Sequence, residues 1–370
     1  MEDGWQMKGQ LGFGCMRLPM KEDQVDEGEF KRMVDAFLTA GFNYFDTAHG
    51  YLNGKSEIAI RECLVKRYPR CSYLLTDKLT ETYFNRQEDI RPFFESQLKA
   101  CGVEYFDFYL MHAQNARNFE KFKSCQAYET ALELKNEGKI RHLGISFHDT
   151  ADVLEKILKT YPQIEVVQIQ FNYVDFEDPI VQSRACYEVC RKYEKAVIVM
   201  EPVKGGTLVD LPQEALDLLK LQNNGSPASY AIRFAASFDG VCMVLSGMSN
   251  LEQLLDNVSY MQQFKDFTIE EHFLIEQINR ILKSLDSISC TSCGYCVEGC
   301  PKRIAIPRLF SDMNQKRRHP HWNYKQAYAM HTSNRGKASD CIGCGKCELA
   351  CPQHLKIREH LKWIVEEFES

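Results

Sequence analysis

Short apolar runs alternate with segments of helical periodicity from residue 11 to about residue 260. Eight of the runs have the length and the β-branched or aromatic content of buried strands. They cover residues 11–15, 43–46, 73–78, 106–112, 142–146, 166–171, 196–200 and 241–246. The stretches between them are amphipathic, as where Phe30, Met33, Val34 and Phe37 share one face of a predicted helix. This alternation predicts repeated βα units and a parallel sheet.

The number of strands favours a closed barrel over an open sheet. Eight strand–helix units over about 250 residues are typical of the (β/α)8 TIM barrel, an α/β fold. An open dinucleotide-binding sheet would also carry a G-x-G-x-x-G loop after a strand, and the sequence has none. We therefore expect a barrel over residues 1–285, with its chemistry at the carboxyl ends of the strands.

Two dense cysteine motifs follow the expected barrel. Each has the spacing C-x2-C-x2-C-x3-C-P, formed by Cys290, Cys293, Cys296 and Cys300 before Pro301 and by Cys341, Cys344, Cys347 and Cys351 before Pro352. In bacterial ferredoxins the first three cysteines of such a motif bind one cluster and the fourth binds the partner cluster. We predict one 4Fe-4S centre on Cys290, Cys293, Cys296 and Cys351, and another on Cys341, Cys344, Cys347 and Cys300. Tetrahedral zinc is the alternative, but it leaves no role for a third close cysteine.

The motifs define a second expected domain over residues 286–370, small and ferredoxin-like, built of helices and loops, with its boundary near Asp286. The 40 residues between the motifs contain several basic and aromatic residues. They form either a helical collar packed on the clusters or the barrel, or a docking surface for an acidic redox partner. The residues concerned are Lys316, Arg317, Arg318, Trp322, Tyr324 and Tyr328.

The remaining composition narrows the class of protein. Lys and Arg total 45 against 51 Asp and Glu, so nothing in the charge favours nucleic acid or an anionic membrane as a partner. No segment approaches the length of a membrane span, and a soluble cytoplasmic protein is expected. The eight cysteines outside the motifs are predicted to be buried small hydrophobic residues; they are Cys15, Cys63, Cys71, Cys101, Cys125, Cys186, Cys190 and Cys242.

The loop after the second expected strand carries the most specific motif of the barrel. Residues 43–57 read NYFDTAHGYLNGKSE, and this segment resembles the aldo-keto reductases. The resemblance extends over residues 10–265 through Lys78, His112, the Gly-Ile-Ser at 144–146 and the motif at 167–172. Residues 286–370 resemble the ferredoxin domain found at the C-terminus of one branch of that family.

The resemblance implies a catalytic tetrad of Asp46, Tyr51, Lys78 and His112. Tyr51 would protonate the carbonyl oxygen while hydride arrives at carbon, and Lys78 would make the phenol a stronger acid. An ammonium about 4 Å from the phenolate lowers the tyrosine pKa by about three units at a dielectric near 20, before desolvation is counted. Asp46 would hold Lys78, and a neutral His112 would orient the carbonyl.

The resemblance also implies a nicotinamide cofactor, either NADPH or NADH. Ser146 and Gln168 would bind the carboxamide. Either Met200 or Glu201 stands where a stacking aromatic is common after the seventh strand. The adenosine end would lie near Ser246, Gly247, Gln253 and Asn257. NADPH-preferring relatives carry Lys or Arg where Gly247 and Gln253 align, so the clamp for a 2′-phosphate is not evident.

The leading hypothesis is an oxidoreductase that reduces a small aldehyde or ketone, or oxidises an alcohol, while two 4Fe-4S clusters exchange electrons with a partner protein. One alternative is an electron-transfer protein whose barrel is only a docking platform. The other is an active reductase whose clusters are structural. Substitution of Tyr51 and the redox response of the clusters separate the three.

Overall fold

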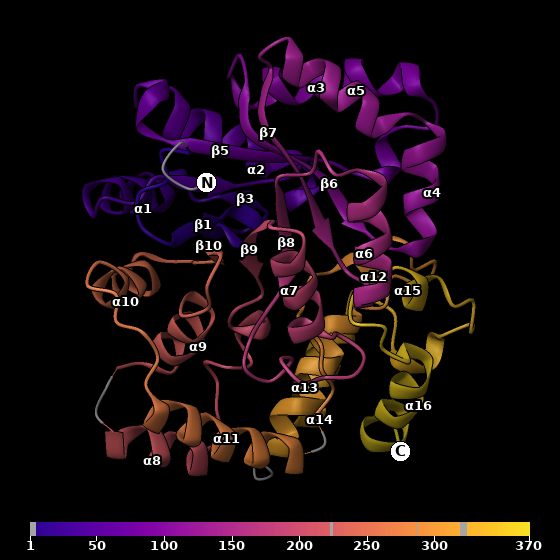
Figure 1. Ribbon diagram of the computed structural model, residues 1–370. Helices are drawn as coiled ribbons and strands as arrows, with labels where there is room; N and C mark the ends of the chain where they lie inside the picture. Colours follow the sequence, from indigo (N-terminus) through magenta and orange to yellow (C-terminus); the bar gives the residue numbers. More distant parts are fainter. Residues whose placement is uncertain (1–4, 223–224, 286, 319–323) are drawn as a thin grey trace. The chain divides into compact units, whose positions relative to one another are not determined.

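The computed structural model describes residues 5–222, 225–285, 287–318 and 324–370. Asp286 and Trp322, named above, lie outside these ranges. The chain forms two compact units, one of Met1–Pro202 with Ala228–Phe267 and the other of Val203–Pro227 with Thr268–Ser370. The order of the elements along the chain is shown in Figure 1.

The first unit contains a closed eight-stranded parallel barrel, which confirms the predicted fold. Its strands are β1 (Leu11–Gly14), β4 (Tyr44–Asp46), β5 (Leu74–Leu79), β6 (Phe106–Gln114), β7 (Ile140–Phe147), β8 (Val166–Gln170), β9 (Ala196–Met200) and β10 (Val241–Ser246). Neighbouring strands pair in sequence order, and β10 closes the barrel onto β1. All eight predicted strands are present, with ends shifted by at most two residues. The structure also contains an antiparallel pair, β2 (Met20–Lys21) and β3 (Gln24–Val25). It was not predicted, because strands of two residues have no recognisable hydrophobic pattern.

The inside of the barrel has an apolar end and a polar end. Tyr44, Phe108, Leu110, Val166 and Ile198 form one buried cluster, against which the N-terminal segment packs. Because side chains alternate along a strand, the residues two or four positions later point inward at the carboxyl end of each strand. Asp46, Lys78, His112 and Gln168 lie at such positions after Tyr44, Leu74, Phe108 and Val166, so four of the residues predicted to be functional share the polar end.

Helices flank the barrel in sequence after most strands. They are α1 (Glu27–Thr39), α2 (Lys55–Ile60), α3 (Gln87–Cys101), α4 (Ala116–Ser124), α5 (Ala127–Asn136), α6 (Ala151–Thr160), α7 (Ser183–Lys192), α9 (Pro227–Ala236) and α10 (Leu251–Met261). Helix α1 shows why they form where they do, because the Asp26 side chain caps its first turn and accepts a hydrogen bond from the Glu29 backbone N–H at 3.0 Å. Phe30, Met33 and Phe37 are its buried face.

The second unit is mainly helical. Its helices are α8 (Gln213–Gln222), α11 (Ile269–Ser284), α12 (Tyr295–Glu298), α13 (Ile306–Arg318), α14 (Tyr324–Thr332), α15 (Lys346–Leu349) and α16 (Ile357–Phe368). Leu309, Phe310, Leu361 and Ile364 centre a core that includes two of the motif cysteines. The compact units differ from the domains expected from the sequence, because the second unit also includes Val203–Pro227 and begins again at Thr268. The domain limits 1–285 and 286–370 therefore stay a prediction. Among the described helices, none combines the length and apolar composition needed to cross a bilayer.

Candidate functional site

Three of the four predicted catalytic side chains form one chain of polar contacts at the carboxyl ends of β4 and β5. Lys78 Nζ lies 2.7 Å from Asp46 Oδ2 and donates to the Thr47 carbonyl at 2.7 Å. The same ammonium lies 3.3 Å from the Tyr51 hydroxyl oxygen, and 4.9 Å from the centre of its ring. Asp46 and Lys78 are fully buried. The buried ammonium is therefore fixed between a carboxylate and the phenol.

His112 completes this group from strand β6. Its ring centre is 6.0 Å from that of Tyr51, and the two rings are nearly perpendicular, at 75°. His112 Nδ1 lies 2.6 Å from the hydroxyl oxygen of Thr80, which follows β5. Burial, and next the positive charge of Lys78, hold the pKa of His112 well below its usual range. The imidazole is therefore neutral, with one nitrogen contacting Thr80 and the other free to face a substrate.

The acidity of Tyr51 differs from the sequence-based expectation. Burial, followed by the charge of Asp46, raises the pKa of Tyr51 well above its ordinary value. Burial and the nearby carboxylates outweigh the positive charge of Lys78, whose Nζ lies 3.3 Å from the Tyr51 hydroxyl oxygen. Burial also raises the pKa of Asp46, against the opposing effect of Lys78. In the ligand-free protein the phenol is fully protonated at neutral pH.

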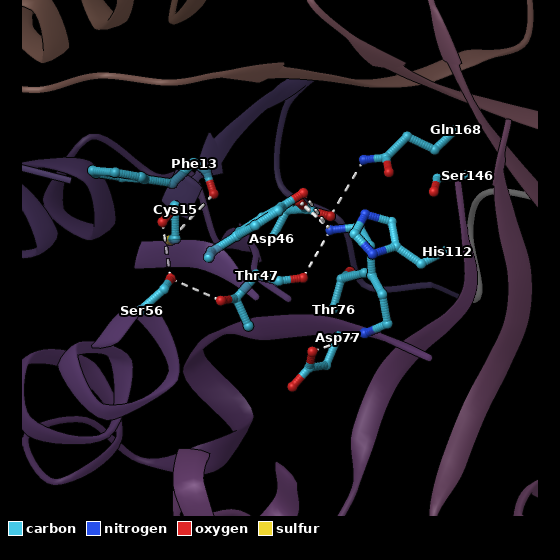
Figure 2. Close-up of polar contacts among 12 residues, drawn as sticks. Phe13, Cys15, Asp46, Thr47, Ser56, Thr76, Asp77, His112, Ser146 and Gln168 are labelled. Carbon is cyan, nitrogen blue, oxygen red and sulfur yellow. Dashed lines mark hydrogen bonds and ion pairs between the residues drawn. The ribbon is translucent and has the colours of Figure 1, made fainter. Parts of the chain in front are cut away.

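The residues predicted to bind the nicotinamide lie on neighbouring strands. Gln168 in β8 is buried, and its amide nitrogen donates to Asp46 Oδ1 at 3.3 Å (Figure 2). Ser146 in β7 is buried and its hydroxyl oxygen accepts from the Ala113 backbone N–H at 2.7 Å. Gln168 therefore joins the Asp46–Lys78 group directly, while Ser146 is fixed beside the end of β6. Met200 is half-buried at the end of β9.

The residues predicted for the adenosine end form a separate group after β10. Asn257 in α10 is buried and donates to the Ser246 hydroxyl at 2.8 Å. Gly247 is exposed and lies against the side chain of Arg17, which pairs with Glu201 at 3.6 Å. The Gln253 side chain caps its own loop by accepting from the Ser249 backbone N–H at 2.8 Å. The sequence did not indicate that Arg17 lies here, because it follows the first strand and is far in sequence from Gly247.

Two features beside the tetrad were missed by sequence reasoning. Thr80 comes two residues after Lys78, so its contact with His112 depends on how β5 and β6 pair. Behind Lys78, Asp77 points away from Asp46 and His112 (Figure 2) and accepts from the Lys78 backbone N–H at 2.8 Å. Two side chains of α3 also donate to the Asp77 carboxyl group. They are the Cys101 thiol at 3.7 Å and the Gln97 amide at 2.9 Å.

A second buried carboxyl group, Glu57 of α2, accompanies Asp77. One oxygen of each and the thiol of Cys101 lie within 4.8 Å of one another. Glu57 Oε2 contacts His49 Nδ1 at 2.8 Å, whereas its Oε1 is buried with no hydrogen-bond partner among the described residues. Burial, and then the nearby Glu57, raise the pKa of Asp77 well above its usual range. A proton on Asp77 would supply the donor that Glu57 Oε1 lacks.

The two cysteine motifs repeat in conformation as well as in sequence. Ser292 and Gly343 occupy equivalent positions with φ of 56° and 72°, and Gly294 and Gly345 follow with φ of 85° and 74°. These left-handed residues turn each loop back so that its three cysteines face one volume. Inside the first loop the Ser292 backbone N–H donates to Cys290 Sγ at 3.4 Å. Such a bond favours the thiolate form that iron requires.

The cysteines line two cavities of similar size. The lining of the first includes Cys290, Cys293, Cys296 and Cys351. The lining of the second includes Cys341, Cys344, Cys347 and Cys300. Each cavity thus takes three thiols from one motif and the fourth from the other. Four converging soft ligands around a compact volume fit an iron–sulfur cubane.

The other cysteines and the basic residues between the motifs have structural surroundings. Cys71 is exposed, which corrects the expectation of burial, and the other seven scattered cysteines are buried. The Cys71 exposure follows from its place in a surface turn before β5. Arg318 pairs with Asp210 at 2.9 Å, and Lys316 pairs with Glu367. Arg317 lies 3.9 Å above the ring of Trp363. These three cations belong to the helical collar.

Comparison with protein families identifies both parts of the chain. Residues 10–280 match the model of the aldo/keto reductase family, and residues 289–355 match the 4Fe-4S dicluster domain. One relative is a 9,11-endoperoxide prostaglandin H2 reductase of Trypanosoma cruzi, 26% identical over 73% of this chain and 87% of that protein. Another is an NADH-specific methylglyoxal reductase of Escherichia coli, 28% identical over 47% of this chain and 57% of that protein.

Solved structures share the barrel fold at low sequence identity. An aldo-keto reductase of Bacillus halodurans in its holo form is 24% identical and superposes with a TM-score of 0.58, covering 73% of this chain and 92% of that one. An aldo-keto reductase of Klebsiella pneumoniae in complex with NADPH is 17% identical with a TM-score of 0.60, covering 75% and 95%. Sequence motif, fold and family match agree. The chain belongs to the aldo/keto reductase family of oxidoreductases and carries a C-terminal 4Fe-4S dicluster domain.

Proposed function

We propose that the barrel reduces a small aldehyde or ketone, or oxidises the corresponding alcohol, with a nicotinamide cofactor. The observation that carries this proposal is the contact chain from Asp46 through Lys78 to Tyr51, with His112 beside it. A bound nicotinamide supplies or accepts the hydride. The protein's own task is then to bind the carbonyl oxygen and to move one proton to or from it.

Tyr51 is the proposed proton donor. Its raised pKa keeps the phenol protonated at neutral pH, so it starts the reduction as the acid. When its proton has moved to the carbonyl oxygen, the phenolate that remains lies 3.3 Å from Lys78 Nζ. The ammonium stabilises this developing charge, and Asp46 with the Thr47 carbonyl fixes its position. The lysine therefore acts mainly on the charge formed during reaction.

His112 is proposed to bind the carbonyl oxygen through Nε2. For Nε2 to carry the hydrogen in a neutral ring, Nδ1 must be the acceptor. The Thr80 hydroxyl, 2.6 Å from Nδ1, is placed to donate to it. Thr80 is therefore a positioning residue that selects the tautomer able to orient the substrate.

Ser146 and Gln168 are the proposed ligands of the nicotinamide carboxamide. The Ser146 hydroxyl oxygen already accepts one hydrogen bond, so its own hydrogen remains as a donor. Gln168 retains its amide oxygen as an acceptor while its nitrogen contacts Asp46. A carboxamide needs one donor and one acceptor, and these two residues supply both. Met200 would line this end of the cofactor.

Ser246, Gly247, Gln253 and Asn257 are proposed to surround the adenosine end. None of these side chains is cationic, and the nearby Arg17 is paired with Glu201. This favours NADH over NADPH, in keeping with the name of the Escherichia coli relative. Initial rates with each nucleotide at matched concentrations test the preference.

The dicluster domain is proposed to hold two 4Fe-4S clusters that exchange single electrons with a partner protein. The lining of the two cavities supports the crossed ligand sets, with Cys351 joining the first motif and Cys300 the second. Iron and sulfide analysis of the anaerobic chain tests the number, with about eight iron expected.

The decisive experiment on the barrel is Tyr51→Phe, assayed anaerobically for methylglyoxal reduction with NADH. The ring and its packing on Lys78 remain, so a loss of at least about a hundredfold in kcat/KM assigns the proton transfer to the hydroxyl. Tyr68→Phe is the matched control, because that hydroxyl contacts Asp35 on the surface of the same unit. Full activity of Tyr51→Phe would refute the role of this hydroxyl in proton transfer. Absence of activity in the parent chain with several carbonyls would favour the docking-platform alternative.

A separate measurement addresses whether the clusters are structural. The visible spectrum is followed while NADH and substrate are added to the anaerobic chain, with bleaching near about 400 nm expected from cluster reduction. Turnover that is the same with oxidised and with reduced clusters would instead make them structural supports of an active reductase.

A further inference from the structure

The two cluster-binding loops are a matched pair within the second unit. They read C-T-S-C-G-Y-C from Cys290 and C-I-G-C-G-K-C from Cys341. The left-handed positions coincide, so the two backbones present the cysteines in the same way. Differences between the two sites must then come from the side chains around them.

The first difference is exposure. Thr291 and Ile342 occupy equivalent positions, and they are 2% and 61% exposed. Thr291 is covered by backbone, since a Cβ added to Gly205 would come within 2.3 Å of the Thr291 carbonyl oxygen. Among the cysteines, Cys344 is exposed whereas its counterpart Cys293 is half-buried. The second loop is therefore the open one.

The second difference is charge. No charged side chain of the described residues lines the first cavity, whereas Lys302, Lys346 and Arg358 line the second. Arg358 is paired with Glu348 at 2.7 Å and contributes little net charge. Lys302 and Lys346 are exposed and have no ion pair within the described chain. Two uncompensated cations thus stand beside the second site.

Cations beside a cluster have two physical effects. They stabilise the reduced form, which carries one more negative charge than the oxidised form. They also attract a negatively charged protein toward the nearest exposed point. Lys316 and Arg318 of α13 have neither effect to the same degree, because both are already paired with carboxylates.

We propose that the cluster held by the second loop is the one that exchanges electrons with a small acidic one-electron carrier protein. The proposal rests on the proposed function, in that both cavities must hold clusters. Lys302 and Lys346 attract the carrier, and the exposed side chain of Ile342 lies beneath it. In each event one electron leaves the reduced carrier, which is oxidised, and lowers the second cluster's core charge from 2+ to 1+. No bond is formed or broken, and the reverse transfer follows the same route.

The first test measures the midpoint potential of each cluster by EPR-monitored redox titration of the anaerobic chain. Cys293→Ala, which keeps only the second site, identifies its signal. In Lys302→Gln/Lys346→Gln we expect that signal to titrate at a lower potential and the other to stay. Lys362→Gln, an exposed lysine of α16 that lines neither cavity, is the matched control and should shift neither. A shift of the first cluster alone, or of neither, overturns the proposal.

The second test uses stopped flow, with a reduced plant-type ferredoxin as the acidic probe, which donates one electron to the oxidised cluster. Oxidised cytochrome c is the basic probe, and it accepts one electron from the reduced cluster. We expect the rate with ferredoxin to fall as salt is raised and to drop by about threefold or more in the double lysine variant at low salt. The rate with cytochrome c should not fall on substitution. Equal rates in parent and variant overturn the docking assignment. An iron content below about four per chain overturns the proposed function itself, whereas eight iron with unchanged potentials and rates overturns only this inference.

Discussion

The barrel site and the cluster sites achieve fixed geometry by different means. In the barrel, Asp46, Lys78 and His112 are held by paired parallel strands, and their contacts exist without any ligand. In the second unit, short helices and loops surround two cavities lined by thiols, and two of the cysteines are part of the core itself. The comparison teaches that the first site is fixed by the pairing of strands, and we propose that bound clusters contribute to the stability of the second unit.

The largest effect is expected from pairs of cysteine substitutions, which test how the cluster sites are shared between motifs. Cys293→Ala/Cys351→Ala removes two ligands of the same proposed cluster, so about four iron should remain. Cys293→Ala/Cys300→Ala removes one ligand from each, and the iron content should fall well below that number. Iron analysis with EPR measures both.

The same variants test the contrast with the barrel. We expect the second unit to unfold at lower temperature when a cluster is lost, while the barrel keeps its own thermal transition and its carbonyl reductase activity. Equal iron contents in the two double variants would refute the crossed ligand sets. Loss of the barrel transition in parallel with iron would refute the contrast itself.

A smaller effect is expected from substitution of Thr80. This substitution tests whether the geometry of the barrel site is already fixed by the protein's own contacts. Thr80→Val removes the donor to His112 Nδ1, so the productive tautomer is no longer selected and kcat should fall by about tenfold. Thr80→Ser keeps the hydroxyl and should restore most of the rate. Steady-state kinetics over a range of pH measure the change. The same loss in both variants would indicate a packing role instead.

The smallest effect concerns the carboxyl pair behind Lys78. Because the folded-state pKa of Asp77 is raised, its contribution to stability is full below the unfolded value near 4 and is lost as pH rises through the folded value. Asp77→Asn retains the acceptor for the Lys78 N–H and provides an amide donor toward Glu57. In this variant we expect the free energy of unfolding to decrease less as pH rises. The difference should be about 1.4 kcal/mol for each unit of pKa shift removed.

Urea unfolding at several pH values between 4 and 9 measures that slope. Asp152→Asn, an exposed residue of α6, is the matched control and should leave the slope unchanged. If Asp77→Asn is less stable than the parent chain at every pH, the two carboxyl groups do not share a proton.

The sequence by itself determined the architecture of the barrel and the presence of a dicluster domain. Buried parallel strands are mostly apolar on both faces, with polar residues near their carboxyl ends, so all eight were visible as short apolar runs. The cysteine motifs were equally visible, because cluster ligands are set by spacing within one loop. Local patterns of this kind require no knowledge of what lies across the molecule.

Tertiary structure alone decided the features that depend on groups distant in sequence. The contact of Thr80 with His112 depends on the pairing of two strands, and the proximity of Glu57 to Asp77 depends on how α2 packs on the barrel. The raised pKa of Tyr51 reversed the expectation from charge alone, since burial and Asp46 outweigh Lys78. Exposure likewise distinguishes the two cysteine loops, although the spacing of their cysteines is identical. Desolvation and packing depend on many residues that are distant in sequence, so the pattern of residues along the chain does not reveal them.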